Sequence, residues 1–277
     1  MQSKIRILSV INLLALLIHI FFSYATQFKL VNSLDVGQIS DRYVSLFTPA
    51  GFTFAIWGFI YVALLGFCIF HLFLAFSRVP AYQSNQDISR IGGLFMFNNL
   101  AAAAWLLAWT HNRIGFSLGL IWFQLITLML IHRLINIHDP KRQTASKVFT
   151  QFPLSIYLGW ISIATIANTA VYLSSANWDG YGYSAIIWTR IMIGVAVLLT
   201  LFVVLLRYNV FFGLVVIWAL YGIIRKLQIS NSVTYVDIIQ TAWISIAIVS
   251  IVCIIQFIKN LATKRIQYRY PESVPIK

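Results

Sequence analysis

Charged residues are scarce in this chain of 277 amino acids. They make up 10% of the sequence, while hydrophobic residues make up 60%, whereas soluble domains contain about 25% charged residues. A chain of this composition cannot cover a water-facing surface, which excludes the soluble, disordered and collagen-like classes. There are only two cysteines, Cys68 and Cys253, and both lie in apolar runs, so a disulfide scaffold is excluded as well.

Acidic residues are the scarcest, and the sequence predicts all seven in loops or at helix ends: Asp35, Asp41, Asp87, Asp139, Asp179, Asp237 and Glu272. Proton- or sodium-coupled transporters and paired-carboxylate enzymes depend on a carboxylate inside the membrane, and none is expected here. The sequence also has no Walker A loop, dinucleotide fingerprint, HExxH or CxxC motif. We therefore predict that the protein is not an enzyme and needs no obligatory cofactor or metal.

What the sequence has instead is a series of long hydrophobic runs. A helix needs about 20 apolar residues to cross a bilayer, and the runs predict an all-α fold, a polytopic transmembrane helix bundle of about eight spans. A count of seven is the alternative, because the sixth and seventh runs are separated only by Arg207 and Tyr208 and the seventh is short. The expected spans are residues 7–24, 52–76, 93–110, 115–136, 152–173, 186–206, 209–224 and 238–258.

Basic residues outnumber acidic residues by 20 to 7. They lie between or after the hydrophobic runs, so we interpret them as topology signals and not as a nucleic-acid-binding surface. Most fall on the side of the N-terminus, which predicts an integral protein of the cytoplasmic (inner) membrane with both termini in the cytoplasm. Residues 1–25 resemble a signal peptide in outline, but the apolar run is long and a retained first helix is expected.

Two loops on the opposite side are candidates for covering a pocket: residues 27–50 and residues 174–185. The second is rich in aromatic residues, and the alternative role for its rings is anchoring at the membrane interface. His19 and His71 are the only histidines that lie well inside the expected spans, away from their ends. We expect both to be hydrogen-bonded packing residues, with axial ligation of haem as the alternative.

Aromatic, amide and alanine residues form stripes at helical spacing on the second, third and fifth expected helices. An amide without a partner in hydrocarbon costs a few kcal/mol, so Asn98, Asn99 and Asn168 should face protein or a cavity. Rings beside small residues on converging faces suit a flat apolar pocket for planar aromatic ligands, while ordinary helix packing is the alternative. The stripes comprise Trp57 and Tyr61, then Asn98, Ala102, Trp105 and Trp109, and then Tyr157, Trp160, Ala164 and Asn168.

Three segments that contain these stripes resemble the TspO/MBR family, the translocator proteins also called tryptophan-rich sensory proteins. They read RYVSLFTPAGFTFAIWGFIY (42–61), GLFMFNNLAAAAWLLAW (93–109) and FPLSIYLGWISIATIANTAVY (152–172). The resemblance covers residues 1–176, which correspond to a five-helix TspO-like membrane domain. Residues 177–277 then form a three-helix C-terminal extension with a basic tail, which could cover the dimer face of short family members and leave this chain monomeric.

The resemblance implies a pocket under the first loop that binds porphyrins, haem breakdown products, sterols or drug-like aromatic molecules. Carried over residue by residue, it implies ligand contacts from Trp57, Tyr61, Asn98 or Asn99, Trp105, Trp160, Ala164 and Asn168, and we add Trp109 and Tyr157 from the same stripes. Helix geometry favours Asn98 over Asn99, because Asn98 shares the stripe of Trp105. The family's Lys-Pro is replaced by Phe47-Thr48-Pro49 and its loop tryptophan is absent, which argues against photochemical porphyrin breakdown.

The predicted function is therefore that of a membrane binding and sensory protein. Embedded in the lipid bilayer, it would hold a porphyrin-like or other hydrophobic aromatic molecule, with porphyrin or haem as a candidate ligand, and pass a signal to an unidentified partner. Uncoupled transport of small amphipathic solutes is the alternative.

Overall fold

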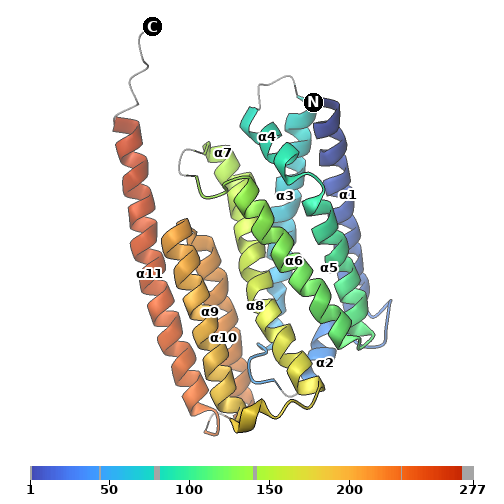
Figure 1. The fold of residues 1–277 in the computed structure, drawn as a ribbon, viewed down its shortest axis with the longest axis vertical. Coiled ribbons are helices and arrows are strands. Elements are labelled where there is room, and N and C mark those ends of the chain that lie inside the picture. Colours follow the sequence, from blue (N-terminus) through green and yellow to red (C-terminus); the bar gives the residue numbers. More distant parts are fainter. Residues whose placement is uncertain (1, 44, 78–81, 140–141, 232, 270–277) are drawn as a thin grey trace.

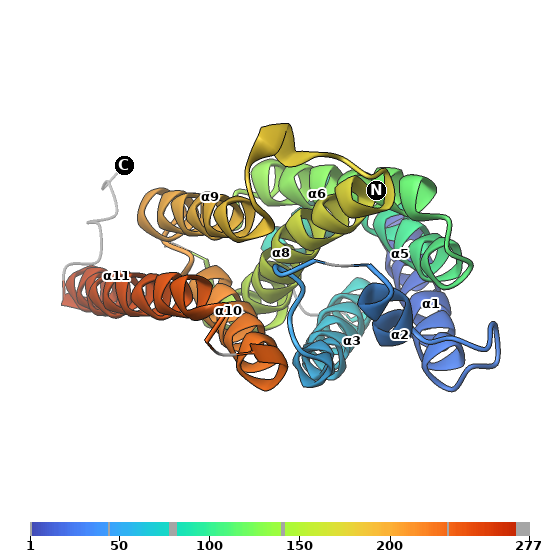
Figure 2. The ribbon, with the colours of Figure 1, turned by 90° about the horizontal axis from the view of Figure 1, so that it is seen from below.

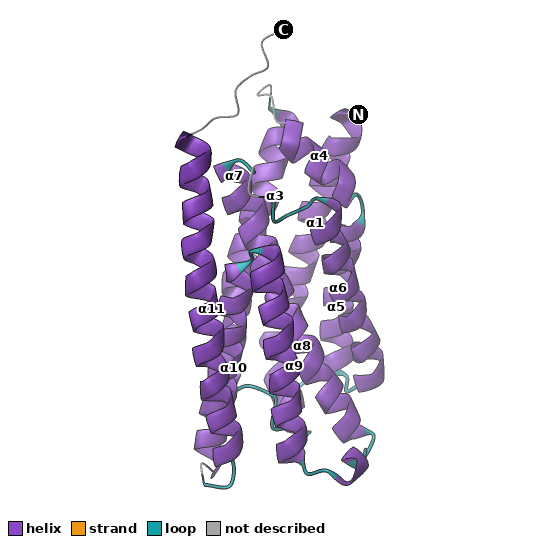
Figure 3. Ribbon diagram, turned by 60° about the vertical axis from the view of Figure 1, so that its left-hand side comes forward, coloured by secondary structure: helices purple, strands orange, loops and turns teal. Residues whose placement is uncertain are grey.

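The computed structural model describes residues 2–43, 45–77, 82–139, 142–231 and 233–269. These residues contain helices and no strands (Figure 3). In chain order the elements are α1 (Gln2–Gln27), α2 (Val36–Asp41), η1 (Gly51–Ala55), α3 (Ile56–Phe76), α4 (Tyr82–Ile91), α5 (Leu94–Thr110), α6 (Ile114–Leu134), α7 (Thr144–Ser146), η2 (Lys147–Gln151), α8 (Phe152–Ser175), η3 (Gly180–Gly182), α9 (Ala185–Arg207), α10 (Val210–Asn231) and α11 (Val236–Arg269).

Each of the eight predicted spans corresponds to a long helix. In the described part of the chain, 7 helices are long and apolar enough to cross a membrane. Helix α5 has 17 residues and, together with α4, from which it is bent by 57°, makes an eighth candidate span. The prediction of an all-α polytopic membrane protein is confirmed. Helix α1 begins and α11 ends at the same end of the bundle (Figure 1), as an even number of spans requires.

The turn between α9 and α10 shows why two such close apolar runs are separate helices. Tyr208 has a left-handed backbone (φ 55°), a conformation that residues other than glycine seldom adopt, and it ends α9. The side chain of Asn209 then accepts a hydrogen bond from the Phe212 amide (3.3 Å) and caps α10. Helix α10 continues to Asn231 and is therefore longer than the predicted span, 209–224.

Two polar segments that lack a long apolar run, and that the sequence therefore places between the spans, are helical. Helix α2 lies inside the first loop (residues 27–50) and begins with a capping box, in which Asp35 accepts from the Gln38 amide at 2.8 Å. Helix α4 precedes α5, and Asp87 lies within it, so the expectation that every acidic residue falls in a loop or at a helix end is wrong for Asp87. The end of the predicted basic tail, residues 270–277, lies outside the described residues.

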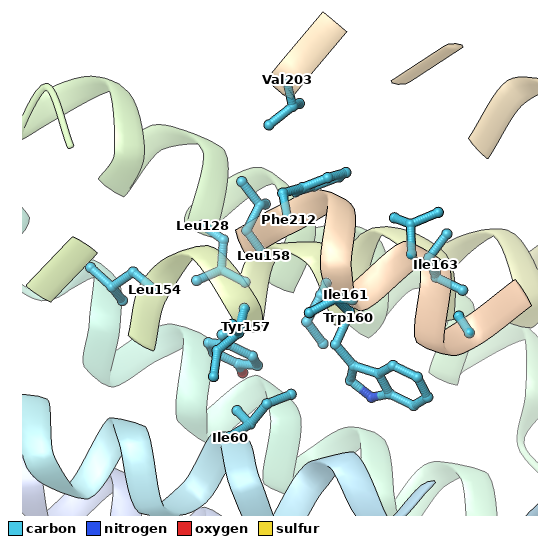
Figure 4. Close-up of a cluster of buried hydrophobic side chains, with 14 of the residues drawn as sticks. Ile60, Leu128, Leu154, Tyr157, Leu158, Trp160, Ile161, Ile163, Val203 and Phe212 are labelled. Carbon is cyan, nitrogen blue, oxygen red and sulfur yellow. The ribbon is translucent and has the colours of Figure 1, made fainter. Parts of the chain in front are cut away.

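Helix α10 connects the first five long helices to the C-terminal ones. It packs against α8, α9 and α11, and Figure 2 shows it between α8 and α11. At Gly159 of α8 an added Cβ atom would lie 3.1 Å from the Cβ of Val215, so the two helices approach closely. One hydrophobic core includes residues from both parts, and Figure 4 shows Tyr157 and Trp160 of α8 in the same cluster as Phe212 of α10.

Candidate functional site

A cavity of about 560 Å³ lies beneath the first loop, a volume typical of sites for small molecules. We call it the outer cavity. Helix α1 contributes polar side chains to its wall, the first loop contributes Asp35, Val36 and Gly37, and the start of α3 and the end of α5 contribute aromatic rings. The residues that border the cavity include Ser23, Gln27, Gly51, Phe52, Phe54, Trp57, Tyr61 and Trp105.

A second, much smaller space lies on the side of Trp57 and Trp105 that faces α6 and α8. This inner cavity has a volume of about 30 Å³, room for about one water molecule. Its wall includes Trp57, Trp105 and Trp160, and it shares Trp57 and Trp105 with the outer cavity. The tryptophans of three helices therefore do turn inward around one space, but the volume that can take a larger molecule lies on the loop side of Trp57 and Trp105.

Ring contacts and hydrogen bonds fix the orientation of these tryptophans. Trp57 stacks on Tyr61 (ring centroids 5.3 Å apart, interplanar angle 22°) and meets Trp160 edge-on at 6.3 Å, both favourable aromatic geometries. Trp105 stacks on Trp109 at 5.3 Å, and its indole nitrogen donates a hydrogen bond to the side-chain oxygen of Asn168 at 2.8 Å. The wall between the two cavities is therefore built from rings held in place by their neighbours.

His19 of α1 connects this wall to a buried polar network. Its Nδ1 lies 3.0 Å from the Asn99 side-chain oxygen, and the Asn99 amide nitrogen donates to the Phe95 carbonyl at 2.9 Å. Because the Asn99 oxygen can only accept, Nδ1 of His19 carries the proton, and Nε2 is left to accept from the Tyr61 hydroxyl at 3.3 Å. His19 also borders the inner cavity. It was expected only as a packing residue, although it shares a buried face of α1 with Ser9 and Asn12.

Replacement of Asn99 by leucine is expected to lower the free energy of unfolding by about 1–3 kcal/mol, because the buried Nδ1–H of His19 loses its acceptor. The measurement is thermal or denaturant unfolding in detergent micelles. Because His19 also accepts from the buried Tyr61 hydroxyl, the triple variant Asn99→Leu, His19→Leu, Tyr61→Phe should recover most of this loss, since it leaves no donor of this network without an acceptor. Equal stability of the wild type and the Asn99→Leu single variant would contradict the proposed network.

The ten predicted site residues divide into two groups of five. Trp57, Tyr61, Trp105, Trp160 and Ala164 border the cavities. The others lie behind this wall: Asn168 and Asn99 as described, Trp109 donating to the Val36 carbonyl at 3.0 Å, Tyr157 fully buried and edge-on to Trp57 at 6.0 Å, and Asn98 donating to Thr127 at 2.7 Å.

Neither Asn98 nor Asn99 borders the outer or the inner cavity, so the choice between them as a ligand contact stays a prediction. Asn98 points to α6, where its amide nitrogen donates to the Gln124 carbonyl at 2.9 Å and to Thr127. Asn99 instead contacts His19 at the inner cavity. Asn98 and Trp105 do lie on one face of α5. Different helices pack against the two sides of this face, so two residues on it can have different neighbours.

Trp160 carries an unused hydrogen-bond donor at the inner cavity. Its side chain is 2% exposed, and its indole nitrogen has no partner among the described residues. A buried donor without an acceptor is costly, so this N–H group lowers the stability of the fold.

Comparison with known proteins gives one match. The family model described as TSPO-like protein matches residues 9–255. The match runs past residue 176 through α9, α10 and much of α11, so it includes the C-terminal helices as well as the five helices with the aromatic stripes. No curated protein and no solved structure shows a significant match to the chain.

Proposed function

The chain belongs to the TSPO-like family of membrane proteins, and on that premise we propose that it binds a porphyrin-like or other hydrophobic aromatic ligand in the outer cavity. The observation that carries the proposal is the wall of inward-facing rings, in which Trp57 and Trp105 border both cavities. Flat aromatic faces beside a volume of about 560 Å³ match the shape and chemistry of planar aromatic ligands.

The polar groups of the cavity wall support the same proposal. Ser23, Gln27 and Asp35 border the outer cavity, and the Tyr61 hydroxyl lies beside His19. An amphipathic ligand such as a porphyrin, with an apolar ring and carboxylate substituents, could stack on Trp57 while its edge accepts hydrogen bonds from Ser23 and Gln27. The sensory role follows from the resemblance to the family and is part of the same proposal. We propose that a partner protein receives the signal.

Titration of the purified protein with protoporphyrin IX and with haem tests this function. We expect saturable binding at about micromolar concentration, followed by tryptophan emission and Soret absorbance. The Trp57→Ala variant should bind about tenfold more weakly, since it loses stacking and burial equivalent to about 1.4 kcal/mol.

The matched control is Trp122→Ala, because Trp122 lies on α6 with 45% of its surface exposed, away from both cavities. Equal affinities of wild type, Trp57→Ala and Trp122→Ala would indicate partition into detergent and refute the site. Net uptake of porphyrin into proteoliposomes, beyond the bound amount, would favour the transport alternative.

A further inference from the structure

One face of α10 holds the segment that forms the outer wall of the cavity. The Ala50 amide donates a hydrogen bond to the Gly222 carbonyl at 3.1 Å, and the Trp218 indole nitrogen donates to the Thr53 carbonyl at 3.0 Å. Trp218 and Gly222 are four residues apart and therefore lie on the same side of the helix. Both ends of the short turn from Ala50 to Thr53 are thus bonded to α10.

Glycine at position 222 is what permits this close approach. A Cβ atom added there would lie 2.9 Å from the Cβ of Pro49 and would overlap the side chain of Thr53. Glycine is unfavourable inside a helix, so its presence in α10 has a packing reason. Thr53 itself is fully buried, and α10 could not reach the turn at this point with any larger residue.

The segment held in this way is part of the outer cavity. Gly51 and Phe52 border the cavity, and the Phe52 ring meets the Trp218 ring edge-on at 5.6 Å. Farther along α10, Lys226 forms an ion pair of 3.1 Å with Asp41 of α2. Figure 2 shows the segment between α2 and α3 beside α10.

Helix α10 is itself firmly packed. An added Cβ atom at Gly213 would overlap the sulfur of Cys253 on α11, and the close approach at Gly159 joins α10 to α8. The helix is therefore a rigid support, one side of which faces the turn at residues 50–53.

We propose that α10 positions the outer wall of the cavity, with Trp218 and Gly222 as the positioning residues, and so gives the C-terminal helices a part in ligand binding. The positioning concerns the protein alone. Only its consequence for the ligand rests on the proposed function.

Hydrogen exchange of the backbone amides at residues 50–55 tests the positioning. In the Gly222→Ala variant these amides should exchange about tenfold faster, which corresponds to a loss of about 1.4 kcal/mol of local stability. Trp218→Phe keeps the ring but removes the donor, and it should shift the same amides in the same direction. The control is Gly194→Ala on α9, where an added Cβ atom meets no described atom within 4 Å. Unchanged exchange in both α10 variants overturns the inference.

Stopped-flow binding of protoporphyrin IX to the full chain tests the consequence. Gly222→Ala and Trp218→Phe should accelerate association and dissociation several-fold, while Gly194→Ala should leave both rates unchanged. If exchange rises but the porphyrin rates stay at the wild-type values, α10 positions the wall but has no part in ligand binding, and that part of the inference fails. If the wild type does not bind the porphyrin, the proposed function fails, and the exchange data still decide whether α10 holds the wall.

Discussion

The Asp87→Asn variant is expected to lose about 3–5 kcal/mol of unfolding free energy, because it leaves a buried arginine without its counter-charge. In the structure the Arg142 guanidinium donates to both Asp87 carboxylate oxygens, at 2.6 and 2.9 Å. The side chains of Arg142 and Asp87 are 2% and 3% exposed. The same guanidinium also donates to Ser146 at 2.7 Å, so the pair joins α4 to the segment between α6 and α8. Denaturant titration in detergent micelles measures the loss.

The matched control is Asp41→Asn, which breaks the ion pair with Lys226. The Asp41 side chain is 71% exposed, and an ion pair this open to solvent contributes about 0–1 kcal/mol. The double variant Asp87→Leu, Arg142→Leu should be more stable than Asp87→Asn, because neither charge then stays buried alone. If both aspartate variants show the same small loss, the pair at Asp87 does not carry the stability assigned to it.

The long helices were predictable because each is encoded by a continuous apolar run, whereas α4 was not. Its polar sequence suggests a loop, yet Ile88 and Ile91 on its buried face are each 1% exposed and Asp87 is neutralised by Arg142. The length of α10 was underestimated for a related reason. Arg225 lies on the exposed side of α10 while Leu227 remains buried. The helix therefore continues past the charged side chain of Arg225.

The candidate site was partly predictable. Helical periodicity shows which face of a helix carries a residue, but it does not show which other helix packs against that face. The stripes placed Trp57, Trp105 and Trp160 around one space, and the structure agrees. They could not show that His19 of α1 would meet Asn99, 80 residues farther along the chain. They also could not show that α10 would hold the first loop, because that contact depends on a helix crossing near Gly222 and not on any local pattern.

Removal of the Trp160 ring is expected to have the largest effect at the site itself. Trp160→Ala should lower the unfolding free energy by about 3–5 kcal/mol, the usual cost of truncating a buried aromatic residue. The ring is 2% exposed and meets Phe54 edge-on at 5.9 Å and Trp57 at 6.3 Å. Porphyrin affinity should fall with it, because the inner end of the ring wall is lost.

The Trp160→Phe variant tests whether the Trp160 indole nitrogen has a partner in the folded protein. Phenylalanine keeps an aromatic ring but removes an indole N–H that has no partner among the described residues. The gain from removing an unpaired donor offsets part of the cost of the lost volume, so stability should stay within about 1 kcal/mol of the wild-type value. Porphyrin affinity should change by less than about twofold, because the proposed ligand occupies the outer cavity, whose wall does not include Trp160. In the control Trp109→Phe, a similar loss of volume comes with the loss of a donor that had bonded the Val36 carbonyl at 3.0 Å, and stability should fall by about 0.5–1.5 kcal/mol more. A loss of stability in Trp160→Phe as large as that in Trp109→Phe would mean that the Trp160 nitrogen already has a partner within the folded protein.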